Sequence, residues 1–448
     1  MYKFFRIFIS FFILFFLVSS TIIYADDINE PLNDDSLIND TIVETTSKPD
    51  EFPNINSRAA IVIDRNSNTI LYGKNEKEKR KMASTTKIMT CIIVLENGNL
   101  NDIVEVSKKS AGTGGSRLGL KTGDKITVKD LLYGLMLCSG NDAAVALAEH
   151  VGGSIEDFSK LMNDKAAKLN LENTHFVTPH GLDNDEHYTT AYELALLSNY
   201  ALKNKDFAQI VGTKSYTVTI NNYTKTLSNT NELLGTLNGI YGIKTGFTNG
   251  ANRCLVTACK RGNMDIICVV LGADTKNFRT KDSIKLIEYV FKEYEPVNLN
   301  TLIKEKFDTW QKENLNDFYI EKGRTQNICL KYEMLEHEII PLKKDKINNL
   351  DIKIKCKSYL VAPVAENYFL GTIDIYSENN LITSTKILTS YKINRKGIFD
   401  YFNYFSKNYI NILTNVQKLK FINSNFKKEL LWNILIYVHL SSFLFIIL

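Results

Sequence analysis

The sequence MASTTKIMT, residues 82–90, places a serine hydroxyl and a lysine amine three positions apart at the start of an apolar run. Residues i and i+3 of a helix share one face, with Cβ atoms roughly 5–6 Å apart, so Lys87 can reach Ser84. Serine is a poor nucleophile without a base beside it, and lysine is such a base only when its pKa falls well below about 10.4. Because Ser-x-x-Lys is common by chance, the pair predicts a nucleophile only if other segments support it.

Two downstream triplets supply the chemistry that such a nucleophile needs. Ser139 offers a second hydroxyl to relay a proton, and Asn141 offers an amide that can hold a carbonyl group or the lysine. Lys244 and Thr245 place a cation beside a hydroxyl, a combination that binds a carboxylate. A second KTG triplet at 121–123 lies between these elements and runs into an aspartate, so we interpret it as a turn. Together the motifs predict a serine-based active site.

Length and composition indicate a globular protein of more than one domain. The chain has 448 residues, of which 44% are hydrophobic and 23% are charged. Its net charge is +4, and no basic block is interleaved with aromatic residues, so no nucleic-acid partner is expected. Seven cysteines without a repeated CxxC spacing disfavour zinc ribbons and disulfide scaffolds, and we interpret them as buried thiols.

The N-terminus is typical of an exported protein. Residues 1–25 combine early basic residues, an apolar stretch and a final alanine, which predicts a signal peptide, with an uncleaved N-terminal anchor as the alternative. Residues 26–56 contain nine acidic residues against one lysine and show no periodicity, so they are predicted to be a disordered linker. The body of the protein is therefore expected outside the cytoplasm.

A catalytic domain is predicted over residues 57–293, in the α/β (α+β) class. An N-terminal hairpin is expected at 59–72, helices with apolar spacings of three and four at 126–169, and a second hairpin at 254–271. A closing helix is predicted at 283–291. Strands at both ends with helices between them predict one antiparallel sheet and a helical lobe.

The remainder is predicted to be a small all-β domain followed by a membrane-binding tail. Short strands are expected within 294–392, and 393–429 reads as an amphipathic helical linker. One apolar stripe recurs along that helix at Ile398, Phe402, Phe405, Tyr409, Ile412, Val416 and Leu419. Residues 430–448 are almost wholly apolar and are predicted to anchor the protein in a membrane. The alternative for the stripe is packing on the β domain or in a coiled coil.

Longer stretches make the chain resemble the penicillin-binding serine D-alanyl-D-alanine carboxypeptidases, relatives of the class A β-lactamases. They are SGNDAA at 139–144, FVTPHGLD at 176–183, TAYE at 190–193, NTNELL at 229–234 and GIKTG at 242–246. The resemblance implies a β-lactamase/DD-peptidase-like fold. It departs from the family at Asn252, where glycine is usual, so asparagine must meet any geometry that requires glycine. It also departs at Thr230, where some relatives carry arginine.

The resemblance also implies a role for each motif residue. The chemical roles fall to Ser84 as nucleophile, Lys87 as base, and Ser139 and Asn141 as proton relay and positioning groups. The substrate carboxylate is expected at Lys244, Thr245 and Gly246 with Arg279, and the oxyanion at the backbone N–H groups of Ser84 and Phe247.

The activity implied by the resemblance is removal of the terminal D-alanine from peptidoglycan stem peptides, without a metal or cofactor. β-Lactams are expected to acylate the same serine, and the enzyme is expected on the extracytoplasmic face of the membrane. Alternatives are a β-lactamase, an endopeptidase on the same site, or a catalytically idle membrane-tethered protein. A class A β-lactamase needs an additional glutamate in a Glu-x-x-Leu-Asn motif, which is absent between residues 141 and 244.

Overall fold

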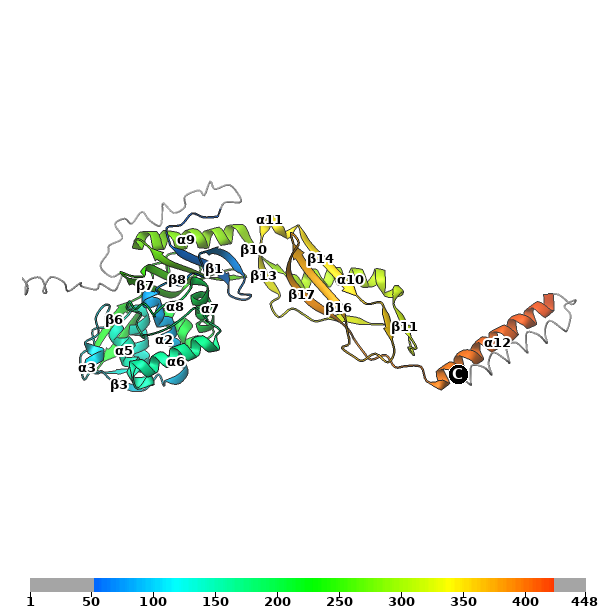
Figure 1. Ribbon diagram of the computed structural model, residues 1–448, viewed down its shortest axis with the longest axis horizontal. Coiled ribbons are helices and arrows are strands. Elements are labelled where there is room, and N and C mark those ends of the chain that lie inside the picture. The colour runs from blue at the N-terminus through cyan, green and yellow to red at the C-terminus, as the bar shows by residue number, and fades with distance from the viewer. Residues whose placement is uncertain (1–51, 423–448) are drawn as a thin grey trace, which may run out of the picture. The chain divides into compact units, whose positions relative to one another are not determined.

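The computed structural model describes residues 52–422 (Figure 1). The predicted signal peptide, most of the predicted linker and the predicted anchor at 430–448 lie outside the described residues. The chain divides into two compact units. The first ends at Leu299 and also contains His337–Asn348, whereas the second contains Asn300–Glu336 and the chain from Asn349 onward.

The first unit is built on a five-stranded antiparallel sheet with the order β2-β1-β9-β8-β7. Its strands are β1 (Ala59–Asp64), β2 (Ile70–Lys74), β7 (Ile240–Thr248), β8 (Asn252–Arg261) and β9 (Met264–Ala273). Because β1 pairs with β9, the N-terminal hairpin and the late hairpin share one sheet, which confirms the prediction. Strand β7 is an edge strand of this sheet, with β8 as its neighbour.

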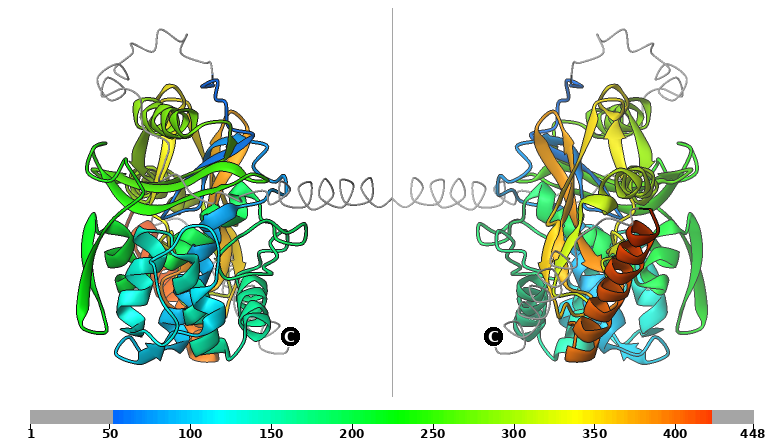
Figure 2. Two further views of the ribbon diagram at one scale, coloured as in Figure 1. Left: turned by 90° about the vertical axis from the view of Figure 1, so that its left-hand side faces the viewer. Right: turned by 90° about the vertical axis from the view of Figure 1, so that its right-hand side faces the viewer.

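Helices cover both faces of this sheet (Figure 1). Helix α9 (Lys276–Glu293) packs on one face, where Val62, Leu255 and Val270 belong to one buried cluster. Neighbouring residues of the same strands point to the other face and join the core of the helical lobe. This alternation is the period-2 pattern of a strand that is buried on both sides. Figure 2 shows the same order of layers from two further sides.

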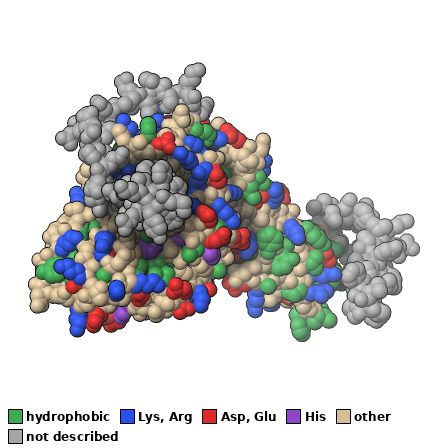
Figure 3. Space-filling view, turned by 60° about the vertical axis from the view of Figure 1, so that its left-hand side comes forward, with side chains coloured by type: hydrophobic (Ala, Val, Ile, Leu, Met, Phe, Trp, Pro, Cys, Tyr) green, Lys and Arg blue, Asp and Glu red, His purple; other side chains and the backbone are tan. Residues whose placement is uncertain are grey.

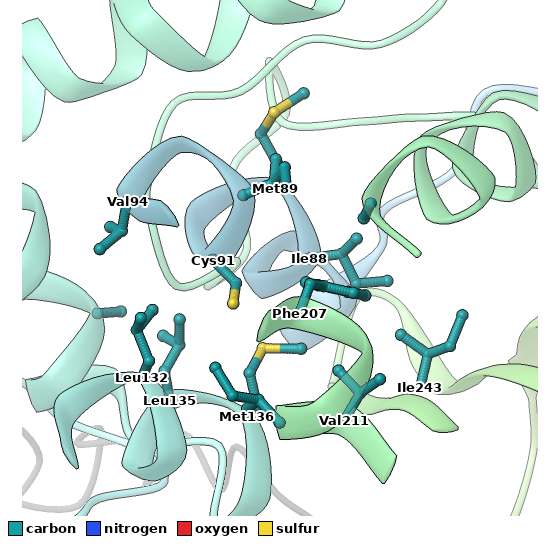
Figure 4. Packing of buried hydrophobic residues seen from close by; sticks show 14 of the residues in the cluster. Ile88, Met89, Cys91, Val94, Leu132, Leu135, Met136, Phe207, Val211 and Ile243 are labelled. Carbon is teal, nitrogen blue, oxygen red and sulfur yellow. The ribbon is translucent and has the colours of Figure 1, made fainter. Parts of the chain in front are cut away.

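The helical lobe contains a 3₁₀ turn, seven α-helices and a small sheet. They are η3 (Ala83–Thr86), α2 (Lys87–Asn97), α3 (Lys108–Ala111), α4 (Val128–Leu137), α5 (Asn141–Gly152), α6 (Ile155–Lys168), α7 (Ala191–Ala201) and α8 (Lys205–Gly212), with β3 (Ile103–Glu105), β4 (Lys125–Thr127), β5 (Ser215–Ile220) and β6 (Tyr223–Ser228). The first eight residues of α2 are all buried, so α2 is the central helix of the lobe. Side chains from α4 and α8 pack around it (Figure 4).

The second unit is a β structure with one helix that sequence reasoning missed. A four-stranded sheet has the order β12-β17-β16-β14, and β11 pairs with β15. These strands are β11 (Tyr319–Glu321), β12 (Leu330–Tyr332), β14 (Leu350–Cys356), β15 (Tyr359–Val361), β16 (Phe369–Ser377) and β17 (Asn380–Thr389). The missed helix is α10 (Leu299–Asn314), which buries Ile303 and Phe307. Strands β10 (Tyr294–Asn298) and β13 (Ile339–Lys343) pair with each other, and α11 (Lys344–Ile347) follows; all three belong to the first unit.

The final described element is α12 (Ile398–Ile422). Most of the large apolar side chains described on this helix are exposed, including Ile398 at 81% and Phe402 at 70%. Phe399, at 80%, is exposed as well, so the apolar surface is wider than the single predicted stripe. Among residues 52–422, no helix is both long enough and apolar enough to cross a bilayer.

The surface drawn in Figure 3 carries charges of both signs, and the cysteines differ in their burial. On the face drawn in Figure 3, lysine and arginine side chains are interspersed with aspartate and glutamate. Four cysteines are buried, at positions 91, 254, 259 and 268. Cys329 is exposed, so the prediction of a buried thiol is wrong at that position.

Candidate active site

Ser84 lies on a tight turn at the entrance to the central helix. The turn η3 is a 3₁₀ helix, in which residues i and i+3 eclipse one another, and this brings Lys87 directly over Ser84. The hydroxyls of Thr85 and Thr86 donate to the carbonyls of Met82 and Ala83 at 2.6 and 2.7 Å, which explains why two threonines follow the serine. Ser84 is only 5% exposed.

Lys87 is fully buried and held by three oxygen atoms. Its Nζ lies 2.8 Å from Ser84 Oγ, 2.7 Å from Asn141 Oδ1 and 2.9 Å from the His180 carbonyl oxygen. The two carbonyl oxygens are acceptors only, so each takes an N–H group of the lysine. The third direction of the amine therefore points at the serine hydroxyl.

The second predicted triplet meets this pair at the start of α5. Asn141 Nδ2 donates to the Gly114 carbonyl at 2.7 Å, which fixes the amide so that its oxygen faces Lys87. Ser139 lies between α4 and α5 with φ of +61°, and its side chain is fully buried. Among the residues that the structure describes, Ser139 Oγ has no hydrogen-bond partner.

Strand β7 brings the third triplet against the nucleophile turn. A Cβ atom added at Gly246 would lie 3.0 Å from the Ser84 nitrogen and 3.1 Å from the Thr85 nitrogen, so any other residue would push the strand and the turn apart by a few tenths of an ångström. Just before the triplet, Ile243 packs with Val211 and Phe207 of α8, close to Ile88 of α2 (Figure 4). Helix α8 therefore holds the nucleophile helix and the edge strand in one packed cluster.

The predicted carboxylate residues fall into two groups. Lys244 is buried, and its Nζ donates to the Thr245 carbonyl at 3.0 Å. Thr245 Oγ1 lies 2.8 Å from Thr230 Oγ1, which places Thr230 beside the triplet. Arg279 lies on α9 and ion-pairs with Glu232, which connects it to the segment that follows Thr230.

Two histidines for which no role was predicted support the nucleophile turn. His187 Nδ1 accepts the Val177 N–H at 3.0 Å, and its Nε2 lies 2.7 Å from the Thr86 hydroxyl. Burial lowers the pKa of His187 to about 4. Burial lowers the pKa of His180 to about 3. Both rings are therefore neutral at pH 7 and act as fixed hydrogen-bonding groups.

The loop 176–183 is tied to the turn after β7. Asp183 accepts the Thr248 hydroxyl at 2.6 Å and the Gly250 N–H at 2.8 Å. In the same turn, Asn252 has φ of +57°, so asparagine does adopt the left-handed conformation that glycine would favour there.

The chain is similar in sequence to known peptidases. Residues 43–275 match the Peptidase_S11 family, D-alanyl-D-alanine carboxypeptidase. The chain belongs to this family of serine peptidases. It is 32% identical to D-alanyl-D-alanine carboxypeptidase DacF of Bacillus subtilis, over 77% of this chain and 88% of the relative. It is 35% identical to DacC of Escherichia coli, over 72% and 88% respectively.

Solved structures of other family members share the fold of this carboxypeptidase. DacD of Francisella tularensis superposes with a TM-score of 0.62 at 26% identity, covering 78% of this chain and 96% of that chain. A mutant of the Streptomyces K15 DD-transpeptidase gives a TM-score of 0.52 at 37% identity, covering 54% and 100%. The chain is thus a serine D-alanyl-D-alanine carboxypeptidase with the β-lactamase-like fold of these enzymes.

The carboxypeptidase site contains residues that sequence reasoning did not select. His187 and Asp183 hold the nucleophile turn and the turn after β7, and Glu232 pairs with Arg279. The first two lie in or near the family-like stretch 176–183, which was a usable signal. Glu232 also lies in a family-like stretch, 229–234, but nothing in that stretch marks its pairing with Arg279, which lies 47 positions away.

Proposed function

We propose that Ser84 is the nucleophile and that Lys87, as a neutral amine, is its base. The observation that carries this role is the contact between Lys87 and Ser84 within a ring of acceptors. A neutral amine has two N–H donors and one lone pair. The Asn141 and His180 oxygens take the two donors, so the lone pair is directed at the Ser84 hydroxyl and can accept its proton.

The substrate is a peptidoglycan stem peptide that ends in D-Ala-D-Ala. Ser84 Oγ attacks the carbonyl carbon of the penultimate residue while Lys87 takes the hydroxyl proton. The peptide C–N bond then breaks, and the departing D-alanine nitrogen receives a proton from Lys87, directly or through Ser139. Water then hydrolyses the resulting ester and regenerates the serine. The stem peptide is thereby shortened by one residue.

The developing oxyanion is assigned to the N–H groups of Ser84 and Phe247. Ser84 lies at the start of a helix, where N–H groups lack intrahelical acceptors. Phe247 follows Gly246 on the edge strand, which approaches the Ser84 nitrogen closely. Each such donor typically contributes about 3 kcal/mol of transition-state stabilisation.

Ser139 and the KTG triplet take the remaining roles. A buried hydroxyl without a protein partner needs a ligand or water to satisfy it, which suits a proton relay at Ser139 Oγ. Lys244 and Thr245 bind the terminal carboxylate of the substrate by charge-assisted hydrogen bonds. β-Lactams acylate Ser84 because they resemble the D-Ala-D-Ala terminus.

The test uses Ser84→Ala and labelled penicillin. Wild-type protein should gain the mass of one penicilloyl group and release D-alanine from a pentapeptide, whereas Ser84→Ala should do neither. A penicilloyl adduct on the alanine variant would contradict the assignment of Ser84. Release of D-alanine from a pentapeptide, compared with cleavage of cross-linked peptides and of penicillin, separates carboxypeptidase activity from the endopeptidase and β-lactamase alternatives.

We also propose that the protein is exported and binds the membrane through its C-terminal part. Helix α12 exposes Ile398, Phe399 and Phe402 where a soluble protein would hide them, and such a helix suits the membrane surface. The apolar residues 430–448 are proposed to continue this attachment on the extracytoplasmic side. The full chain should sediment with membranes after a high-salt wash. A chain ending at Gly397, which keeps the buried Ile393, should be soluble and active on small peptides.

A further inference from the structure

An ion pair lies beside the proposed carboxylate-binding end of the site. Arg279 is fully buried near the N-terminus of α9, and its Nη2 donates to Glu232 Oε1. The same carboxylate oxygen accepts the Thr280 hydroxyl. The other oxygen, Glu232 Oε2, is buried and has no hydrogen-bond partner within residues 52–422. The carboxylate is therefore engaged on one oxygen by two neighbouring residues of one helix.

The backbone fixes Glu232 in this position. The Thr230 N–H donates to the Leu137 carbonyl at 3.1 Å, and Asn231 is buried with its Oδ1 accepting the Leu233 N–H at 3.2 Å. Because Thr230 also contacts Thr245 at 2.8 Å, Glu232 lies two residues from a side chain of the proposed carboxylate site.

This arrangement changes the charge that a substrate meets. Lys244 and Arg279 each contribute one positive charge to this end of the site, and Glu232 removes one. An opposite charge in direct contact with Arg279 weakens the attraction that the arginine exerts on a third group. Together, Lys244, Arg279 and Glu232 have a net charge of about +1. Without Glu232, a substrate carboxylate would meet a net charge of about +2.

We infer that Glu232 is a specificity-determining residue that weakens binding of terminal carboxylates by offsetting the charge of Arg279. This inference rests on the proposed role of Lys244 and Thr245. Both products, free D-alanine and the shortened peptide, also carry carboxylates, so the same charge limits product inhibition. Such binding is present in the ground state and the transition state alike, so its effect falls on KM rather than on kcat.

The test is Glu232→Gln in the full-length enzyme. Glutamine keeps an oxygen that accepts from Arg279 and Thr280, but it removes the charge. With a peptide ending in D-Ala-D-Ala, KM should fall about threefold to tenfold and kcat should stay within about twofold. Inhibition by added D-alanine should strengthen by a similar factor, and the gain should shrink at high salt. A peptide with an amidated C-terminus should show no change in KM.

A matched control removes another carboxylate that pairs with an arginine, on the helix α9 that carries Arg279. Glu288 on α9 pairs with Arg261 at 2.6 Å and is about half exposed, so Glu288→Gln should leave both substrates unaffected. A rise in KM for the free carboxylate alone would overturn the inference, because it would mean that Glu232 orients Arg279 to bind substrate. Equal changes for free and amidated peptides would also overturn it by indicating a structural role. If wild-type enzyme itself does not distinguish the two peptides, the proposed carboxylate site fails instead.

Discussion

The chain contains two Lys-Thr-Gly triplets, and the structure places them in opposite surroundings. Residues 121–123 are exposed in a turn, where the Lys121 N–H donates to Asp124 Oδ2 at 2.8 Å and a Cβ atom at Gly123 would meet nothing within 4 Å. Residues 244–246 lie on the edge strand β7, where Lys244 is buried and Gly246 touches the Ser84 turn. The prediction that the first triplet is a turn is confirmed. Two identical triplets therefore differ in function, because the fold places only the second one beside the nucleophile.

The largest difference between the triplets is expected from their lysines. Lys244→Ala should lower kcat/KM about 100-fold or more for a peptide with a free terminal carboxylate, because a buried charge-assisted contact is lost. An amidated peptide should lose far less. Lys121→Ala should leave both rates unchanged, since its side chain is exposed. Kinetics on the two peptides measure this, and equal losses for both with Lys244→Ala would show that Lys244 does not contact the carboxylate.

Substitution of the two glycines should have different effects: Gly246→Ala should reduce activity, whereas Gly123→Ala should reduce only stability. Gly246→Ala pushes a methyl group to within 3.0 Å of the Ser84 nitrogen, so the nucleophile turn must shift. A misplacement of the reacting groups by about 1 Å can slow a reaction about 100-fold, and relief of this contact needs a few tenths of an ångström, so acylation by penicillin should slow by about tenfold. Gly123→Ala has space but sits at φ of +85°, which costs about 1 kcal/mol of stability with no loss of activity. A Gly246→Ala enzyme that is acylated at the normal rate would remove the steric argument.

The residues proposed for the chemistry could be predicted from the sequence, whereas most of the contacts that hold them in place could not. Ser84 and Lys87 were predicted to be neighbours because they are three residues apart in a helical segment. In the structure, Lys87 Nζ lies 2.8 Å from Ser84 Oγ. The turn that holds them is 3₁₀ rather than α-helical, a difference that spacing alone does not reveal. The contact between Thr86 and His187 joins residues 101 positions apart, so no periodic pattern marks it.

Local sequence patterns predicted some elements of the fold and missed others. The terminal hairpins follow from apolar runs separated by turn residues, and they pair as predicted. Helix α10 was missed although Leu299, Ile303 and Phe307 follow a helical period, because the surrounding segment was interpreted by its strands. The left-handed Asn252 was predictable, since asparagine stands where the family usually has glycine.

The smallest difference expected between the two Lys-Thr-Gly regions is in their response to acid. His187 has a pKa of about 4 in the folded protein because it is buried, against about 6.5 when unfolded. Above pH 6.5 both states are neutral, and its hydrogen bond to Thr86 is fully stabilising. As the pH falls from 6.5 towards 4, only the unfolded state binds the proton, so stability declines by up to about 1.4 kcal/mol per pH unit and then levels off.

Amide hydrogen exchange at pH 7 and pH 5, corrected for intrinsic rates, separates the two triplets on this basis. Protection of the turn at residues 83–87 should fall at pH 5, because the neutral imidazole that supports it becomes costly to keep. The turn at residues 121–123 has no buried histidine in its described contacts and should change little. His187→Gln removes the titrating group, so protection near Ser84 should be lower at pH 7 but less sensitive to pH. If the variant keeps the full acid response, a group other than His187 couples protons to the nucleophile turn.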